Sequence, residues 1–420
     1  MKYTQRKFRA GGVHSSVTSL VTATLDSATI AFPYAVAMNG LVFGPFLILM
    51  TGVVSYFTGM LLVDVAAITK KNRYEDMART LYNPRVEKIV SGILMGCLIS
   101  FSMSYIVFMK QTTPFIIEKL GAKLPGWCNQ SQLGQTFWAV FFSVFIVFPL
   151  AIPRQVGTLR FASLFGVLCS VYLCFTVLFS FFFDKATVPS VQKAWAKAQL
   201  FKFSFDGMVN SLPLIIFAFL NQVVIPQVYG ELVPQNYKRM RMVVFRGNFL
   251  GVFLYSLIGV FGYLSFTDNP EKDLDDKNIL LAPYINNTPI LIGNFAVLFA
   301  TAAAAPMAIL PCKDSIEEMR FKEGMTSRQN LVVTILIVFV SMLLALVIPG
   351  IGYSLTLAGC TFNPAIGFFI PIFFYFKATP EEPYHSPKKI CCILTFIIIL
   401  AASILGFYNF ILSLVNFHKE

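Results

Sequence analysis

One carboxylate stands out among the residues of this chain that could do chemistry. Asp26 and Asp64 are the only charged side chains between positions 9 and 70, and the small polar residues Ser27 and Thr29 lie close behind Asp26. A charge in the middle of a membrane helix costs about 2.5–3.5 kcal/mol to insert, so such a residue is usually kept for a function. Asp26 is therefore the first candidate for binding or carrying a cation.

Several roles stay open for Asp26. A buried carboxyl can take up and release a proton near the working pH, so Asp26 could be a proton-coupling group. It could instead ligate Na+, or pair with the amine of a substrate. The structural alternative is a carboxyl that is protonated or hydrogen-bonded to nearby hydroxyls such as Thr22 and Thr29.

The rest of the chain is suited to a lipid environment. Of its 420 residues, 56% are hydrophobic and 13% are charged, and the mean hydropathy is +0.69, which excludes an ordinary soluble domain. About 20 residues cross a bilayer as a helix. We therefore expect an all-α integral membrane protein with eleven transmembrane helices, at 15–38, 41–66, 89–113, 134–152, 160–183, 207–229, 247–267, 289–311, 329–348, 352–375 and 390–415.

The distribution of basic residues predicts the orientation. Most of the 33 Lys and Arg residues fall in loops on the same side as the N-terminus, and such loops are retained in the cytoplasm. This places the tail 1–14 in the cytoplasm and residues 416–420 in an extracellular or luminal space. Lys110 and Asp64 lie near helix ends, so we expect them to reach the membrane interface. No sorting signal distinguishes a plasma membrane from a lysosome- or vacuole-like membrane.

The sequence argues against several other classes of function. It contains no Gly-x-x-x-x-Gly-Lys phosphate loop, and its histidines are isolated at His14, His385 and His418. No catalytic triad or metal-ligand spacing is visible, so we expect no enzyme, no cofactor and no metal. The net charge of +12 is explained by the cytoplasmic loops, which favour anionic lipid headgroups. We predict membrane lipids as partners and no nucleic acid.

Two helices carry interruptions in corresponding places. Helix 1 contains Pro33 behind small polar residues, and helix 6 contains Pro213 and Pro226 on either side of Asn221 and Gln222. An unwound stretch survives at mid-membrane only where it lines a cavity or binds something, although prolines can also merely kink such helices. Helices 1 and 6 are each the first helix of a group of five. Interruptions in both therefore predict inverted repeats at about 15–183 and 207–375, with an extra helix at 390–415.

Three motifs resemble the amino acid/auxin permeases, a family related to the sodium-coupled neutral and proton-coupled amino acid transporters. The motifs are SATIAFPYA at 27–35, FAFLNQVVIPQVYGEL at 217–232 and PMAILPCKDSIEE at 306–318. The resemblance covers nearly the whole chain. It implies the five-plus-five inverted repeat of the leucine-transporter type, with broken helices 1 and 6 and the domain spanning 15–415.

The resemblance also implies where a substrate binds. Free N–H groups at a half-helix N-terminus attract a carboxylate, and freed carbonyls accept bonds from an ammonium group. The substrate carboxylate would then face Ser27, Ala28 and Thr29. Phe217, Ala218 and Asn221 would lie near the amine, Phe219 would form the wall of the side-chain pocket, and Asp26 and Gln222 complete the predicted set.

The chain departs from the family pattern at two positions that matter for coupling. Ala304 and Ala305 stand before Pro306, where sodium-coupled relatives tend to have a hydroxyl, and the nearest hydroxyl is Thr301. Gln222 replaces the histidine of the family motif in helix 6. We therefore favour H+ over Na+ as the coupling ion, with Asp26, Thr22 and Thr301 as candidate groups.

The leading hypothesis is a secondary active transporter of amino acids that works by alternating access around helices 1 and 6. If Asp26 sits where a substrate carboxylate would bind, repulsion favours basic amino acids or amines that lack a carboxylate. A transporter of cationic amines or polyamines is therefore one alternative. The others are a channel and a non-transporting amino acid sensor. Asn363, Ser102 and Tyr105 could line a pathway or simply join helices.

Overall fold

The computed structural model describes residues 12–25, 27–153, 159–274, 277–285, 287–321 and 324–417, and these form helices without any strand. Ten helices in this part are long and apolar enough to cross a membrane. The predicted all-α membrane fold is confirmed. The spans are Phe43–Thr69 (α4), Pro84–Lys119 (α6), Gln132–Ala151 (α7 to α8), Leu164–Phe183 (in α9, Leu159–Phe183), Phe205–Glu231 (α11 to α12), Tyr237–Leu264 (α13), Thr288–Arg320 (α15), Ser327–Val347 (α16), Ile351–Ala378 (α17 to α19) and Pro387–Phe417 (α20).

A bent helix pair supplies an eleventh span. Helix α2 (Val13–Thr24) and the segment Ala28–Asn39, which includes α3 (Phe32–Asn39), meet at 55°. Short helices absent from the sequence prediction connect the spans. They are α5 (Tyr74–Leu81), α10 (Val191–Lys197) and α14 (Pro270–Asp273).

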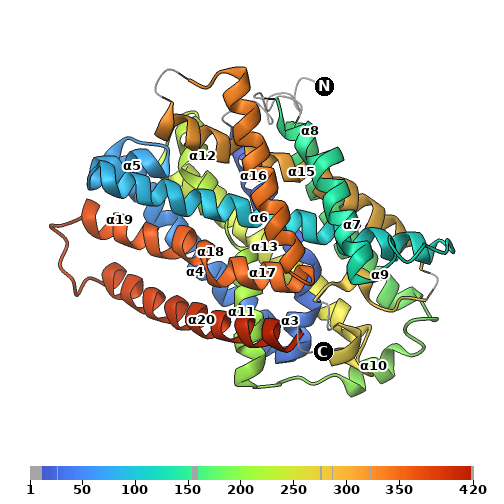
Figure 1. The fold of residues 1–420 in the computed structure, drawn as a ribbon. Coiled ribbons are helices and arrows are strands. Elements are labelled where there is room, and N and C mark those ends of the chain that lie inside the picture. The colour runs from blue at the N-terminus through green and yellow to red at the C-terminus, as the bar shows by residue number, and fades with distance from the viewer. Residues whose placement is uncertain are drawn as a thin grey trace, which may run out of the picture.

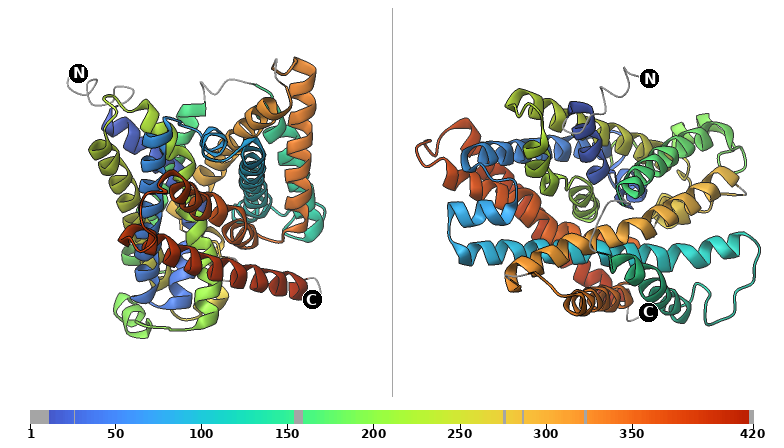
Figure 2. Two further views of the ribbon diagram at one scale, coloured as in Figure 1. Left: turned by 90° about the vertical axis from the view of Figure 1, so that its left-hand side faces the viewer. Right: turned by 90° about the horizontal axis from the view of Figure 1, so that it is seen from above.

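The ends of the helices gather on two sides of the molecule. Figure 1 shows α5, α8 (Phe148–Ala151) and α12 (Ile225–Glu231) in the upper part, with α10 in the lower part. Helix α20 packs on α11 (Phe205–Ala218) and α17 (Ile351–Cys360), and the left view of Figure 2 shows it at the edge of the bundle. The division into two halves with an extra helix at 390–415 stays a prediction.

Buried lysines bond to the carbonyl ends of three helices. The prediction that Lys110 reaches the interface is wrong: it is 3% exposed, and its Nζ donates to the carbonyl oxygens of Ala345 at 2.8 Å and Ile348 at 2.7 Å, at the end of α16. Lys313 bonds in the same way to the end of α8, and Lys389 to carbonyls just after α19 (Ile370–Ala378). The last carbonyls of a helix lack internal partners and favour a cation.

Asp64 pairs with a basic residue near the end of α4. Its carboxylate lies 3.4 Å from the Nζ of Lys388, at the start of α20. The ion pair joins two elements that are more than 300 residues apart in the chain. Asp64 therefore serves to join two helices, and it is not a candidate for the coupling role that we sought for Asp26.

Candidate functional site

The first helix is interrupted where the sequence predicted. Helix α2 ends at Thr24, a 3-10 segment, η1, covers Ser27–Ala31, and α3 begins at Phe32. Pro33 stands in the first turn of α3, where its missing N–H costs nothing. The chain therefore leaves main-chain groups unpaired by α-helical bonds at the middle of the span.

The sixth span is interrupted in the same manner. Helix α11 ends at Ala218, residues 219–221 are not helical, and a 3-10 turn, η3 (Gln222–Val224), leads into α12 with Pro226 in its first turn. The hydroxyl of Ser55, on α4, donates to the carbonyl oxygen of Phe219 at 3.0 Å. A neighbouring helix thus satisfies one of the carbonyls that the interruption frees.

Tyr255 of α13 joins the two interruptions. Its hydroxyl donates hydrogen bonds to the carbonyl oxygens of Thr24 and Ala218, the last residues of α2 and α11. Its ring stacks on Phe32 with centroids 4.1 Å apart and meets Phe219 edge-on at 5.4 Å. One fully buried side chain therefore contacts both sides of the break in helix 1 and the break in helix 6.

A polar chain runs beside Tyr255. The Nδ2 of Asn221 donates to the Thr24 hydroxyl at 3.2 Å and to the Oδ1 of Asn248 at 2.7 Å. All three side chains are less than 5% exposed. Because buried amides are costly to leave unpaired, these bonds fix the relative position of the two interrupted helices and α13.

A large cavity lies next to the breaks. Its volume is about 1560 Å³, and one stripe of α2 lines it with the hydroxyls of Ser15, Thr18, Ser19 and Thr22. These positions recur at helical spacing and therefore share one face. Across the cavity α15 contributes Thr301 and Ala304, and α6, α9 and α12 supply further walls.

Charged residues line the cavity where α5 meets the end of α15, and we call this group the mouth. It consists of Arg73, Glu75, Asp314, Glu317 and Glu318. Arg73 forms an ion pair with Glu318 and lies 3.9 Å from Glu75. The pKa of the Arg73 guanidinium is raised, because the hydrogen bond to Glu318 and the nearby carboxylates outweigh its partial burial, which lowers it. The mouth therefore carries more acid than base.

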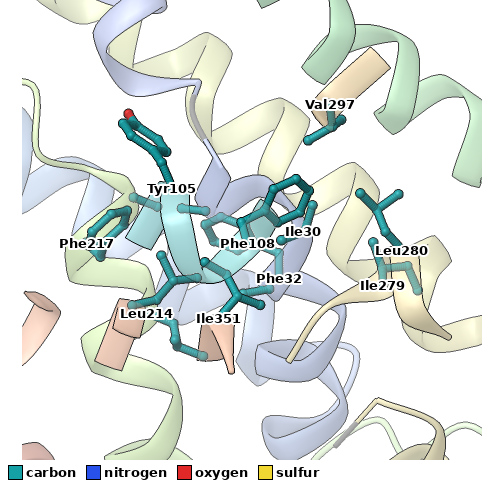
Figure 3. Close-up of a cluster of buried hydrophobic side chains, with 14 of the residues drawn as sticks. Ile30, Phe32, Tyr105, Phe108, Leu214, Phe217, Ile279, Leu280, Val297 and Ile351 are labelled. Atoms are coloured by element: carbon teal, nitrogen blue, oxygen red, sulfur yellow. The ribbon is translucent and has the colours of Figure 1, made fainter. Parts of the chain in front are cut away.

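Apolar side chains close the other end of the cavity. Figure 3 shows a cluster of apolar side chains from η1, α3, α6, α11 and α17, namely Ile30, Phe32, Phe108, Phe217 and Ile351. Each of them is at most 2% exposed. Tyr105, Ile30 and Val297 belong to both this cluster and the cavity lining. In the described part of the chain, charged side chains therefore line one end of the cavity and buried apolar side chains close the other.

The structure separates the predicted site residues into two groups. Thr22, Thr29 and Thr301 line the cavity, so the structure brings these hydroxyls together. The other described members lie behind its wall, and they are Ala28, Phe217, Ala218, Phe219, Asn221 and Gln222. Asp26 lies outside the described residues, and Ser27 begins η1.

Gln222 and Phe219 face other helices instead of the cavity. The Nε2 of Gln222 donates to the hydroxyls of Ser55 at 3.0 Å and Thr58 at 3.1 Å, both on α4. Phe219 packs between α4 and α13, where a Cβ added at Gly52 would lie 3.3 Å from its ring. Both side chains support the break without reaching the space where a solute would sit.

Sequence reasoning missed the residues that hold the breaks. Tyr255 and Asn248 lie within an apolar helix, where a single aromatic or amide residue is usually packing or interhelical contact. Ser55 is likewise one hydroxyl among several in α4. The family-like motifs contain none of these three residues, so no local signal marked them.

The fold and the cavity define a helical membrane protein of the transporter type, with two broken helices beside an internal chamber. The family described as "Transmembrane amino acid transporter protein" matches residues 9–412, and the chain belongs to this family. The crystal structure of MhsT in complex with L-phenylalanine is similar in fold, with a TM-score of 0.59 over 94% of this chain and 97% of that one. Only 12% of the aligned residues are identical.

Proposed function

We propose that the chain is a secondary active transporter that carries an amino acid across the membrane by alternating access. The observation that carries this proposal is the cavity beside both helix breaks, bordered by the mouth at one end and closed by apolar side chains at the other. This is the geometry of a state open to one side only. With the N-terminus in the cytoplasm, that side would be cytoplasmic.

The cavity hydroxyls are the groups we propose for substrate contact in this state. The carbonyl oxygens freed at the breaks already accept bonds from Tyr255 and Ser55, so a substrate ammonium would have to replace those donors. Thr22 and Thr29 reach the cavity from helix 1. Their oxygens can accept bonds from an amine while their backbone stays near the break.

We propose H+ as the coupling ion, taken up by Asp26. Ala304 lines the cavity where sodium-coupled relatives tend to have a hydroxyl, so one oxygen ligand that a sodium site would use is missing. A proton moving inward would gain about 2.3 kcal/mol per 100 mV of membrane potential. These residues support proton coupling better than a sodium site.

Uptake into proteoliposomes tests both parts of this proposal. Wild-type protein should accumulate amino acid under an imposed inward proton gradient. Asp26→Asn should lose accumulation but keep counterflow exchange. Asp64→Asn is the matched control, because Asp64 pairs with Lys388 away from the cavity, and it should accumulate normally. Unchanged accumulation by Asp26→Asn would rule out the coupling role of Asp26. A lack of saturable counterflow in the wild type and in both variants would rule out a transporter.

The acidic mouth favours a second candidate substrate class. Four carboxylates and one guanidinium line it, so its potential should attract cations more than zwitterions. In that case lysine or a polyamine should compete for uptake better than a neutral amino acid. If the strength of competition for uptake depends on the size of the competitor's side chain and not on its charge, the result would favour neutral amino acids as substrates.

A further inference from the structure

A second concave site lies on the outside of the helical bundle, between α4 and α13. It is a groove of about 560 Å³, and its lining comes from one stripe of each helix. The two helices touch where a Cβ added at Gly52 would lie 2.4 Å from Val252, and again nearer the start of α13, where a Cβ added at Gly59 would lie 3.4 Å from Val244.

Most of the groove is apolar and exposed. Val53 on α4 is 51% exposed, and Phe245 and Phe249 on α13 are 57% and 61% exposed. The two phenylalanine rings stack with centroids 6.1 Å apart, and Tyr56 meets Phe245 edge-on. On a membrane-spanning helix such a surface faces lipid tails.

One end of the groove is basic. Lys238 and Arg241 line it there, and both belong to the first two turns of α13, which begins at Tyr237. The positive end of the helix dipole adds to their charge, and helix N-termini favour phosphate groups. This end lies on the side that the distribution of basic residues places in the cytoplasm, where the membrane leaflet carries anionic lipids.

A buried amide donor completes the lining. Asn248 is 4% exposed, and its Nδ2 has no hydrogen-bond partner among the described residues, although its Oδ1 accepts from Asn221. It lies about two helical turns from Arg241. A buried N–H group without a partner is costly, and an ester carbonyl of a bound lipid would satisfy it.

We propose that this groove is a binding site for an anionic phospholipid. The phosphate would lie on Lys238 and Arg241, the glycerol ester near Asn248, and one acyl chain along the stripe of Val53 and Phe249. Three features of the groove favour this class of ligand: the basic residues at one end attract the phosphate, the apolar stripe accepts an acyl chain, and the Asn248 amide can donate to an ester carbonyl. The occupant would contact Asn248 directly, and Asn248 bonds to Asn221 at the break of helix 6.

Native mass spectrometry of the purified protein tests the site. Wild-type protein should retain phosphatidylglycerol several-fold better than phosphatidylcholine at equal concentration. Lys238→Gln/Arg241→Gln should lose that preference about tenfold, whereas Lys238→Arg/Arg241→Lys should keep it. The matched control is Arg85→Gln/Lys88→Gln, which removes two exposed charges near the start of α6 and should bind as the wild type does.

Two further arms separate a lipid groove from simple charge attraction. Val53→Trp fills the apolar part and leaves both basic residues, so it should reduce phosphatidylglycerol retention several-fold. Glycerol phosphate should not displace the lipid, because it lacks acyl chains. Equal retention by wild type and Lys238→Gln/Arg241→Gln, no effect of Val53→Trp, or displacement by glycerol phosphate would each overturn the proposal.

Discussion

The ammonium nitrogen of Lys277 lies 5.2 Å from the centre of the Tyr34 ring and 5.8 Å from that of Tyr353. Tyr34 belongs to α3 and Tyr353 to α17, so one cation contacts the first and tenth spans on the side away from the mouth. Gly352 lies against the same side chain, since a Cβ there would come within 2.6 Å of it. In the proposed transport cycle, Lys277 would help to hold that side closed.

Removing this cation should favour the state that is open on the opposite side. Each cation–π contact contributes about 0.5–1 kcal/mol at an exposed site, so Lys277→Gln should shift the conformational equilibrium several-fold. The measurement is maleimide labelling from the mouth side of Ala304→Cys, a cavity position, in a background where Cys391 and the two cavity cysteines, Cys97 and Cys169, are replaced by Ser. Labelling should slow in Lys277→Gln and stay unchanged in Lys272→Gln. Equal rates in both variants would contradict the closing role.

Tyr255→Phe should uncouple the two breaks while leaving the packing in place. The ring contacts with Phe32 and Phe219 remain, but the carbonyls of Thr24 and Ala218 lose their shared donor. Leaving buried acceptors unpaired costs about 1–3 kcal/mol, so both thermal stability and the maximal transport rate should fall.

Tyr263→Phe is the matched control for Tyr255→Phe. It lies on the same helix, and its hydroxyl accepts a hydrogen bond from the Gln199 amide at 3.0 Å, far from the breaks. This variant should lose some stability and keep its transport rate. A similar loss of transport in both variants would mean that the Tyr255 hydroxyl acts only through stability.

Lys110→Met should destabilise the fold without changing the cavity. The variant keeps most of the side-chain volume but leaves the carbonyls of Ala345 and Ile348 without their donor. We expect a loss of about 1–3 kcal/mol, visible as a lower melting temperature in detergent. Lys88→Met, at an exposed position of α6, should melt as the wild type does. A melting temperature equal to that control would show that the capping bonds contribute nothing.

Hydropathy and proline placement predicted most of the architecture. The apolar runs located every long span, and Pro33 and Pro226 marked the two breaks, because a bilayer forces backbone groups to pair within each helix. The short helix α5 was missed because it is brief and rich in charge. A further irregularity lies at Thr361, between α17 and α18 (Phe362–Pro364), and the hydropathy pattern did not locate it.

The details of the site were harder to predict from the sequence. A break changes the direction of the chain, so helical periodicity cannot say which way Asn221 or Phe219 points beyond it. Both side chains turn toward α13 instead of the cavity. Thr22 lies on α2, before the break, and Thr301 on the continuous helix α15. Within each of these segments helical spacing does predict a shared face, and both residues line the cavity.

The final prediction concerns a loop that should lose stability in acid. Burial alone would raise the pKa of Asp184, but hydrogen bonds from Asn287, from Thr187 and from the backbone outweigh it, so the pKa is lowered. The Nδ2 of Asn287 donates to Asp184 at 2.7 Å. A depressed carboxyl pKa stabilises the fold fully above the ordinary value, and this stabilisation is lost as the pH falls through the lower folded-state value.

A double-mutant cycle isolates this effect. Asn287 also caps α15, since its Oδ1 accepts from the Ile290 amide, so Asn287→Ala alone costs stability at every pH. Combining it with Asp184→Asn and comparing melting temperatures yields the coupling between the two residues. The coupling should stay below about 1 kcal/mol, because solvent screens a partly exposed carboxylate, and it should vanish below the ordinary carboxyl range. Coupling that persists unchanged in acid would show that the carboxylate charge contributes nothing to the contact.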